Sequence, residues 1–163
     1  MNSLIHSPTG LIHLVASMIS LISGTLVLVL TKGTRIHKSI GYIYCLFMLI
    51  VNGTAFGLYH LYGRFGPFHL AALISLVTLL AGIFSVLLRT KSWLNYHLAF
   101  MYYSVMGLYA AFASEVIVRI PGLAFGPAVG IATAVVMITA MIIFQTLSKK
   151  WINKYSSPSL QNN

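Results

Sequence analysis

Two histidines in this sequence each stand near the beginning of a long apolar segment. His37 lies in the stretch KGTRIHKSIGYIY, and His97 lies in NYHLAFMYYS. A neutral imidazole is a common axial ligand of haem iron, so two imidazoles at similar depth could fill both axial positions. We therefore predict haem b as the cofactor, bound by His37 and His97, with its propionates near Arg35, Lys38 or Lys91.

The surroundings of these histidines allow a simpler interpretation as well. Gly41, four residues after His37, would leave room beside a flat macrocycle, which favours a cofactor. A histidine at a helix entrance flanked by lysines can also lie at the membrane surface and hydrogen-bond lipid headgroups or the preceding loop. Both interpretations stay open at this point.

A second group of side chains could bind a metal ion. His13, His69 and Glu115 supply two nitrogen ligands and one oxygen ligand, a combination that suits zinc or another divalent metal. A fourth position would be open for water or for His60. Glu115 has another explanation, because Arg119 stands four residues later and would pair with it on one helix.

The elements that must position these side chains are membrane helices. Of the 163 residues, 58% are hydrophobic and only 7% are charged, whereas soluble domains carry about 25% charged residues. A transmembrane helix needs about 20 mainly apolar residues, and five segments qualify: 10–31, 38–62, 67–88, 93–117 and 122–147. The predicted fold class is therefore all-α, a polytopic membrane helix bundle with five transmembrane helices and short connections.

The basic residues predict how the bundle is oriented. Lys and Arg gather on the cytoplasmic side of short loops. One side of the predicted bundle carries only Arg64 and Arg119, and the other carries Lys32, Arg35, Lys38, Arg89, Lys91, Lys149, Lys150 and Lys154. The N-terminus should therefore be outside and the C-terminus cytoplasmic, with one transmembrane bundle domain over residues 1–155 and a flexible polar tail over 156–163. Bases placed between apolar runs do not form a nucleic-acid-binding face.

This topology sorts the candidate residues into two layers. His37 and His97 fall near the cytoplasmic rim, whereas His13, His69 and Glu115 fall near the outer side. His97 and Glu115 are 18 residues apart, which is five turns at about 3.6 residues per turn, so they share a helix face. Ionisable groups in a span usually face the bundle interior, and we expect this face to point inward.

The last span carries a row of small residues and an early proline. Small residues at a spacing of four let a neighbouring helix approach closely, so we expect this row to pack against another helix. Pro127 should either kink the helix or stand at its beginning. The row consists of Gly122, Gly126, Gly130 and Ala134.

Three stretches of the chain resemble a known family. KGTRIHKSIGYIYCLFM, GRFGPFHLAALISL and NYHLAFMYYS are similar to the bacterial predicted membrane proteins of domain-of-unknown-function family 2306. The similarity runs through nearly all of the chain up to the fourth span, and it implies a membrane location without an agreed activity. Its pattern matches His37, Lys38, Gly41, His97 and Met101 here.

Two further comparisons qualify this resemblance. Family members often carry extra arginines in the fourth span, where this chain has Tyr103 and Glu115. The arrangement of histidines on alternate helices also resembles cytochrome b561-type bundles, which bind two haems. The fifth span here has no histidine, so this likeness allows one haem site.

The predicted function follows from these candidates. The chain is expected to be an integral protein of the bacterial inner (cytoplasmic) membrane that binds haem b and exchanges electrons with a quinone or a redox partner protein. The alternatives are a divalent-metal membrane protein or enzyme that uses His13, His69 and Glu115, and a cofactor-free accessory subunit of a homo- or hetero-oligomer. Hydrolysis by paired carboxylates is excluded, because the chain has one acidic side chain.

Overall fold

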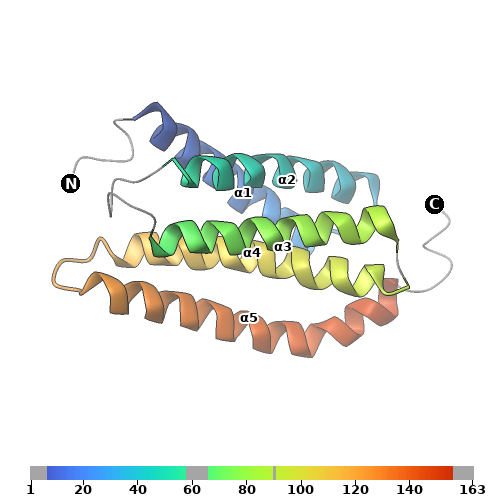
Figure 1. Ribbon diagram of the computed structural model, residues 1–163. Coiled ribbons are helices and arrows are strands. Elements are labelled where there is room, and N and C mark those ends of the chain that lie inside the picture. The colour runs from blue at the N-terminus through green and yellow to red at the C-terminus, as the bar shows by residue number, and fades with distance from the viewer. Residues whose placement is uncertain (1–6, 58–65, 90, 156–163) are drawn as a thin grey trace. The chain divides into compact units, whose positions relative to one another are not determined.

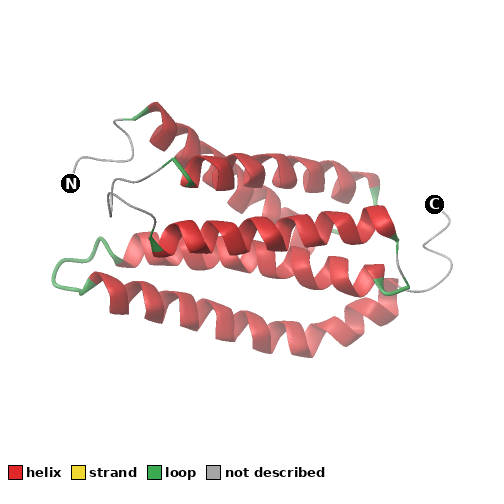
Figure 2. Ribbon diagram, in the orientation of Figure 1, coloured by secondary structure: helices red, strands yellow, loops and turns green. Residues whose placement is uncertain are grey.

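The structure, a computed structural model, describes residues 7–57, 66–89 and 91–155. This part of the chain is helical throughout its regular elements and contains no strand (Figure 2). All five helices are long and apolar enough to cross a membrane, which confirms the predicted all-α membrane fold. In chain order they are α1 Pro8–Val29, α2 Arg35–Ala55, α3 Pro67–Leu88, α4 Trp93–Ile117 and α5 Phe125–Tyr155 (Figure 1).

The beginnings of α1 and α2 are fixed by hydroxyl caps. The Ser7 hydroxyl accepts a hydrogen bond from the Gly10 N–H at 3.0 Å, and Pro8 occupies the first turn, where its missing N–H costs nothing. The Thr34 hydroxyl accepts from the His37 N–H at 3.2 Å. This cap starts α2 three residues before the expected position 38.

The last helix differs most from its predicted range of 122–147. Gly122 has φ +85°, in the left-handed region that a helix interior excludes, so α5 begins only at Phe125. Pro127 therefore lies in the first helical turn, where proline is tolerated. At the other end the polar residues after 147 continue the helix to Tyr155, because lysine is a good helix former outside the membrane as well.

The chain divides into two compact units, Met1–Leu80 and Ala81–Asn163, with the boundary inside α3. In the first unit α1 packs against α2. Apart from Val27, the buried face of α1 consists of small residues, which permit a close approach of the two backbones. These residues are Gly10, Ala16, Ser20, Ser23 and Gly24, and the buried residues of α2 are Tyr44, Met48, Val51 and Asn52.

In the second unit α4 packs against α5 through polar contacts as well as small residues. The Tyr102 hydroxyl donates to the Ala140 carbonyl at 2.9 Å, and the Ser114 and Thr133 hydroxyls lie 3.2 Å apart. The small residues of α5 that are buried are Ala128, Ala132 and Ala140. The row of small residues that was expected to pack against another helix is not buried. Its members Gly126, Gly130 and Ala134 are exposed.

Many large apolar side chains are exposed along all five helices. Exposed leucine, isoleucine and valine are normal on a surface that contacts lipid tails, since nothing is gained there by hiding them. The helices therefore present this surface to the bilayer.

Lys32 closes the C-terminal end of α1. Its Nζ atom donates to the carbonyls of Val27 at 2.9 Å, Leu28 at 2.6 Å and Leu30 at 3.3 Å, three acceptors that the helix itself leaves unpaired. Burial lowers the pKa of Lys32, and these carbonyls oppose that effect by stabilising the charged form.

Replacing Lys32 by Met should lower the free energy of unfolding by about 2 kcal/mol, since hydrogen bonds from a charged donor are lost at a half-buried helix end. Denaturant titration in detergent micelles measures this change. Lys38→Met is the control, because Lys38 is exposed, and it should change stability by less than about 0.5 kcal/mol. Equal effects of the two variants would contradict the capping role.

Arg89, at the end of α3, has φ +43°, a conformation that costs a residue with a Cβ about 1 kcal/mol. Arg89→Gly should therefore raise the free energy of unfolding by up to about 1 kcal/mol, because glycine adopts this conformation without strain. The same titration tests this prediction, with Lys91→Gly in the same connection as the control. A loss of stability in Arg89→Gly would show that the arginine side chain outweighs the backbone strain.

Candidate functional site

The best-defined histidine is His97, in the first turn and a half of α4. Its Nδ1 atom lies 3.0 Å from the carbonyl oxygen of Gly82 on α3, within the same unit. A carbonyl can only accept, so Nδ1 carries the hydrogen, and in the neutral imidazole the lone pair is on Nε2. This is the tautomer of a metal-ligating histidine, whose other nitrogen commonly donates to a backbone carbonyl.

Gly82 permits the close approach of α3 and α4 beside His97. A Cβ atom placed on Gly82 would lie 2.6 Å from Sδ and 3.0 Å from Cγ of Met101, one helical turn after His97. These distances are shorter than carbon and sulfur atoms tolerate, so any larger residue would displace Met101 or separate the helices. Gly82 and Met101 are both buried, and they fix the position of the imidazole relative to α3.

His37 lies at the beginning of α2, in the other unit. Its backbone N–H is bonded to the Thr34 cap, and the residue is half-buried. Its neighbours Arg35 and Lys38 are exposed. The space next to Gly41 is open, because a Cβ placed there would meet no atom within 4 Å. His37 and His97 belong to separate units, and each is described by itself.

His13 is half-buried on α1 and contacts α2. Its Nδ1 atom lies 2.8 Å from the Thr54 hydroxyl, and that hydroxyl itself donates to the Ile50 carbonyl at 2.7 Å. Because the Thr54 hydrogen is directed to Ile50, Thr54 accepts from His13, and Nδ1 carries the imidazole hydrogen. The contact joins α1 to the C-terminal end of α2.

His69 caps its own helix. The Gly66 N–H donates to His69 Nδ1 at 3.1 Å, so the third residue of α3 bonds the backbone before the helix, as the Glu of a capping box does. In the neutral imidazole the hydrogen is then on Nε2, which is the opposite tautomer to that of His13 and His97. The ring is buried, with the Phe56 ring at a centroid distance of 6.4 Å. A hydrogen on Nε2 makes this nitrogen a donor rather than a metal ligand.

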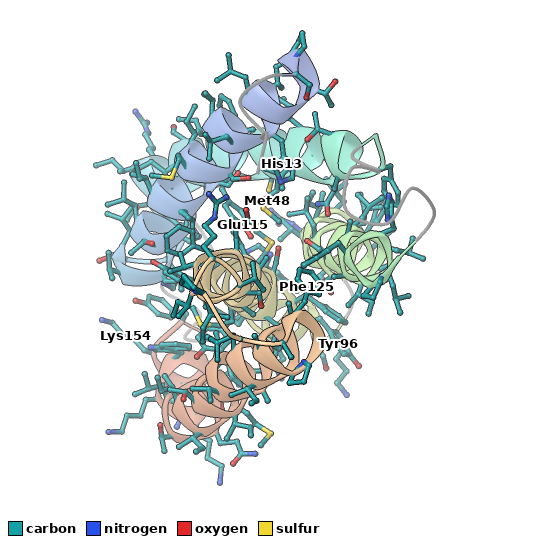
Figure 3. The ribbon with its side chains drawn as sticks, turned by 90° about the vertical axis from the view of Figure 1, so that its left-hand side faces the viewer. His13, Met48, Tyr96, Glu115, Phe125 and Lys154 are labelled. Atoms are coloured by element: carbon teal, nitrogen blue, oxygen red, sulfur yellow. The ribbon has the colours of Figure 1, made fainter. Side chains whose placement is uncertain are left out.

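Glu115, labelled in Figure 3, forms an ion pair with Arg119 one turn later on the same chain segment. The pairing that the spacing of four residues suggested is therefore the one in the structure. Arg119 is exposed and Glu115 is partly exposed rather than buried in a polar interior, because Glu115 lies only two residues before the end of α4, where solvent or headgroups can reach it.

The three residues of the expected zinc site divide between the two units, and each unit is described by itself. His13 and His69 belong to the first unit and Glu115 to the second. Across the described ranges, no three His, Cys, Asp or Glu side chains lie close enough to hold a metal ion. Each of the three has a partner within its own unit: Thr54 for His13, the Gly66 N–H for His69 and Arg119 for Glu115. His60, the expected fourth ligand, lies outside the described residues.

Sequence reasoning missed the two residues that position the imidazoles. Gly82 and Thr54 carry no charge and no ligand chemistry, so residue type alone does not identify them. A signal for Gly82 existed in the sequence, since it is the only glycine of the third apolar segment and lies in its C-terminal half. Such a glycine often marks a close approach between helices.

Comparison with known proteins agrees with this description of a membrane protein. The model of the family described as "Predicted membrane protein (DUF2306)" matches residues 10–152, which is most of the chain. Searches of the curated proteins and of the solved structures found no significant match. The matched region contains all the candidate residues described above, and the chain therefore belongs to the DUF2306 family of predicted membrane proteins.

Proposed function

We propose that this membrane protein binds haem b, with His97 and His37 as axial ligands, and transfers electrons within the bilayer. The observation that carries the proposal is the hydrogen bond from His97 Nδ1 to the Gly82 carbonyl. This bond holds the ring in the tautomer that offers Nε2 as a ligand, and it increases the basicity of that nitrogen. A histidine that only faced headgroups would not need a buried carbonyl partner.

The second ligand is proposed from the sequence position of His37 and from its surroundings. Gly41 leaves open space on the same helix, one turn after His37. The exposed Arg35 and Lys38 offer positive charge for carboxylate groups such as haem propionates. These features suit a flat, apolar cofactor with two anionic substituents.

The chain's own residues would bind and shield the cofactor. A bound haem supplies one-electron chemistry, and the protein would orient it through His97 and exclude water with the apolar helix faces. Electron exchange with a quinone or a redox partner protein is the corresponding use in a membrane. Among the described residues, those outside the helices form short connections, so the proposed chemistry is assigned to the helices.

Absorption spectroscopy tests the proposal. The full-length protein, purified in detergent from cells supplied with haem precursor, should show a Soret band and a sharper visible band after reduction. His97→Ala and His37→Ala should each lose this spectrum, because one ligand is removed. His13→Ala is the matched control and should keep it. A colourless wild-type protein would contradict the haem function.

Gly82→Ala tests the positioning of His97. Because the added Cβ would collide with Met101, the Gly82 carbonyl should shift and haem affinity should fall by about tenfold, as for other partners of metal-bound histidines. Gly107→Ala is the control, since a Cβ at Gly107 of α4 meets no atom within 4 Å. Haem titration followed by the Soret band measures affinity, and thermal unfolding of the haem-free protein measures packing. Unchanged affinity in Gly82→Ala would remove Gly82 from the site.

A further inference from the structure

Five basic side chains gather at one end of the second unit. Two stand in the connection between α3 and α4, and three stand in the last turns of α5. All five are exposed. We call this set the basic rim, and it consists of Arg89, Lys91, Lys149, Lys150 and Lys154.

The charge of the basic rim is not balanced by acidic side chains of the chain. The only acidic side chain is Glu115, which lies near the opposite end of α4 from Lys91 and is paired with Arg119. Like charges that stand close together repel each other, so an anion from outside the chain would stabilise the rim.

The length of α5 places the rim at headgroup depth. The helix has 31 residues and is about 46 Å long at about 1.5 Å per residue. The hydrocarbon core of a bilayer is about 30 Å thick, so about ten residues of α5 extend beyond it. Figure 1 shows α5 curving toward its C-terminal end, where the three lysines are.

Tyr102 of α4 holds this end of α5 in place. Its buried hydroxyl donates to the Ala140 carbonyl, and its ring lies 5.1 Å from the Phe144 ring and 6.0 Å from the Trp151 ring. The aromatic side of the last turns therefore faces α4. At about 100° per residue, Lys150 points about 100° and Lys149 about 160° away from Trp151, so both project from the outer side.

We propose that the basic rim binds the headgroup phosphate of an anionic phospholipid. Ammonium and guanidinium groups form charge-assisted hydrogen bonds with phosphate oxygens. The neighbouring Trp151 and Tyr155 are the side chains that prefer the same interfacial depth. Lys154, labelled in Figure 3, lies 5.4 Å from the Tyr155 ring, which keeps an ammonium group beside an interfacial aromatic ring. The apolar face of α5 would accommodate the acyl chains of the same lipid.

Lipid titration of the full-length protein in detergent tests this site. Native mass spectrometry should show phosphatidylglycerol binding in preference to phosphatidylcholine. Lys149→Gln/Lys150→Gln should weaken phosphatidylglycerol binding about tenfold or more, because two of five cations are lost. Lys149→Arg/Lys150→Arg should bind as the wild type does. Gel filtration and circular dichroism establish that each variant is folded.

A matched variant separates this site from a general effect of net charge. Arg35→Gln/Lys38→Gln also removes two exposed cations, but from the first unit, and it should retain most of the phosphatidylglycerol affinity. An equal loss in both double variants would overturn the proposal, as would wild-type affinity in Lys149→Gln/Lys150→Gln. Displacement of the lipid by equimolar inorganic phosphate would identify a soluble phosphate site instead.

Discussion

Polar groups inside a bilayer must find partners within the protein, and this requirement governs the structure. Helices satisfy the backbone, because each N–H and C=O is bonded within one segment. Side-chain hydroxyls follow the same rule by donating to the carbonyl one turn earlier in their own helix. Such bonds join Ser17 to His13, Ser23 to Ile19, Thr25 to Leu21, Thr54 to Ile50, Thr78 to Ile74 and Ser85 to Ala81. Other polar side chains hydrogen-bond to a neighbouring helix instead. These side chains join the helices or belong to the candidate site.

The fold was predictable from the sequence because apolar length alone determines which segments span a membrane. Helix boundaries were less predictable, since they depend on single backbone groups. The Thr34 cap began α2 earlier than the apolar pattern indicated, and the positive φ of Gly122 began α5 later. The extension of α5 to Tyr155 was missed because a hydrophobicity criterion does not detect a polar helical end.

The positions of the candidate residues along their helices were predictable, and their tautomers were not. Helix spacing placed His13, His37, His69 and His97 near the beginnings of helices, and the spacing of four residues indicated the ion pair of Glu115 with Arg119. Spacing carries no information about tautomers, however. His69 resembled a metal ligand in the sequence, whereas the Gly66 N–H makes its Nε2 a donor. His97 is distinguished from it only by the Gly82 carbonyl, a backbone group that any residue would supply.

The polar side chains of α4 have a physical explanation in these contacts. The most apolar windows of α4 and α2 both have a mean hydropathy of 1.2, against 2.5 for α3 and 2.3 for α5, and the α4 window is the most buried of the five, at 39%. A helix surrounded by protein can carry polar side chains if each meets a partner on a neighbour. His97 meets the Gly82 carbonyl of α3, and Tyr102 and Ser114 meet carbonyls of α5. Because these bonds run from α4 to both neighbours, α4 holds the second unit together. A ligand bound at His97 would therefore be held by the most constrained helix of that unit.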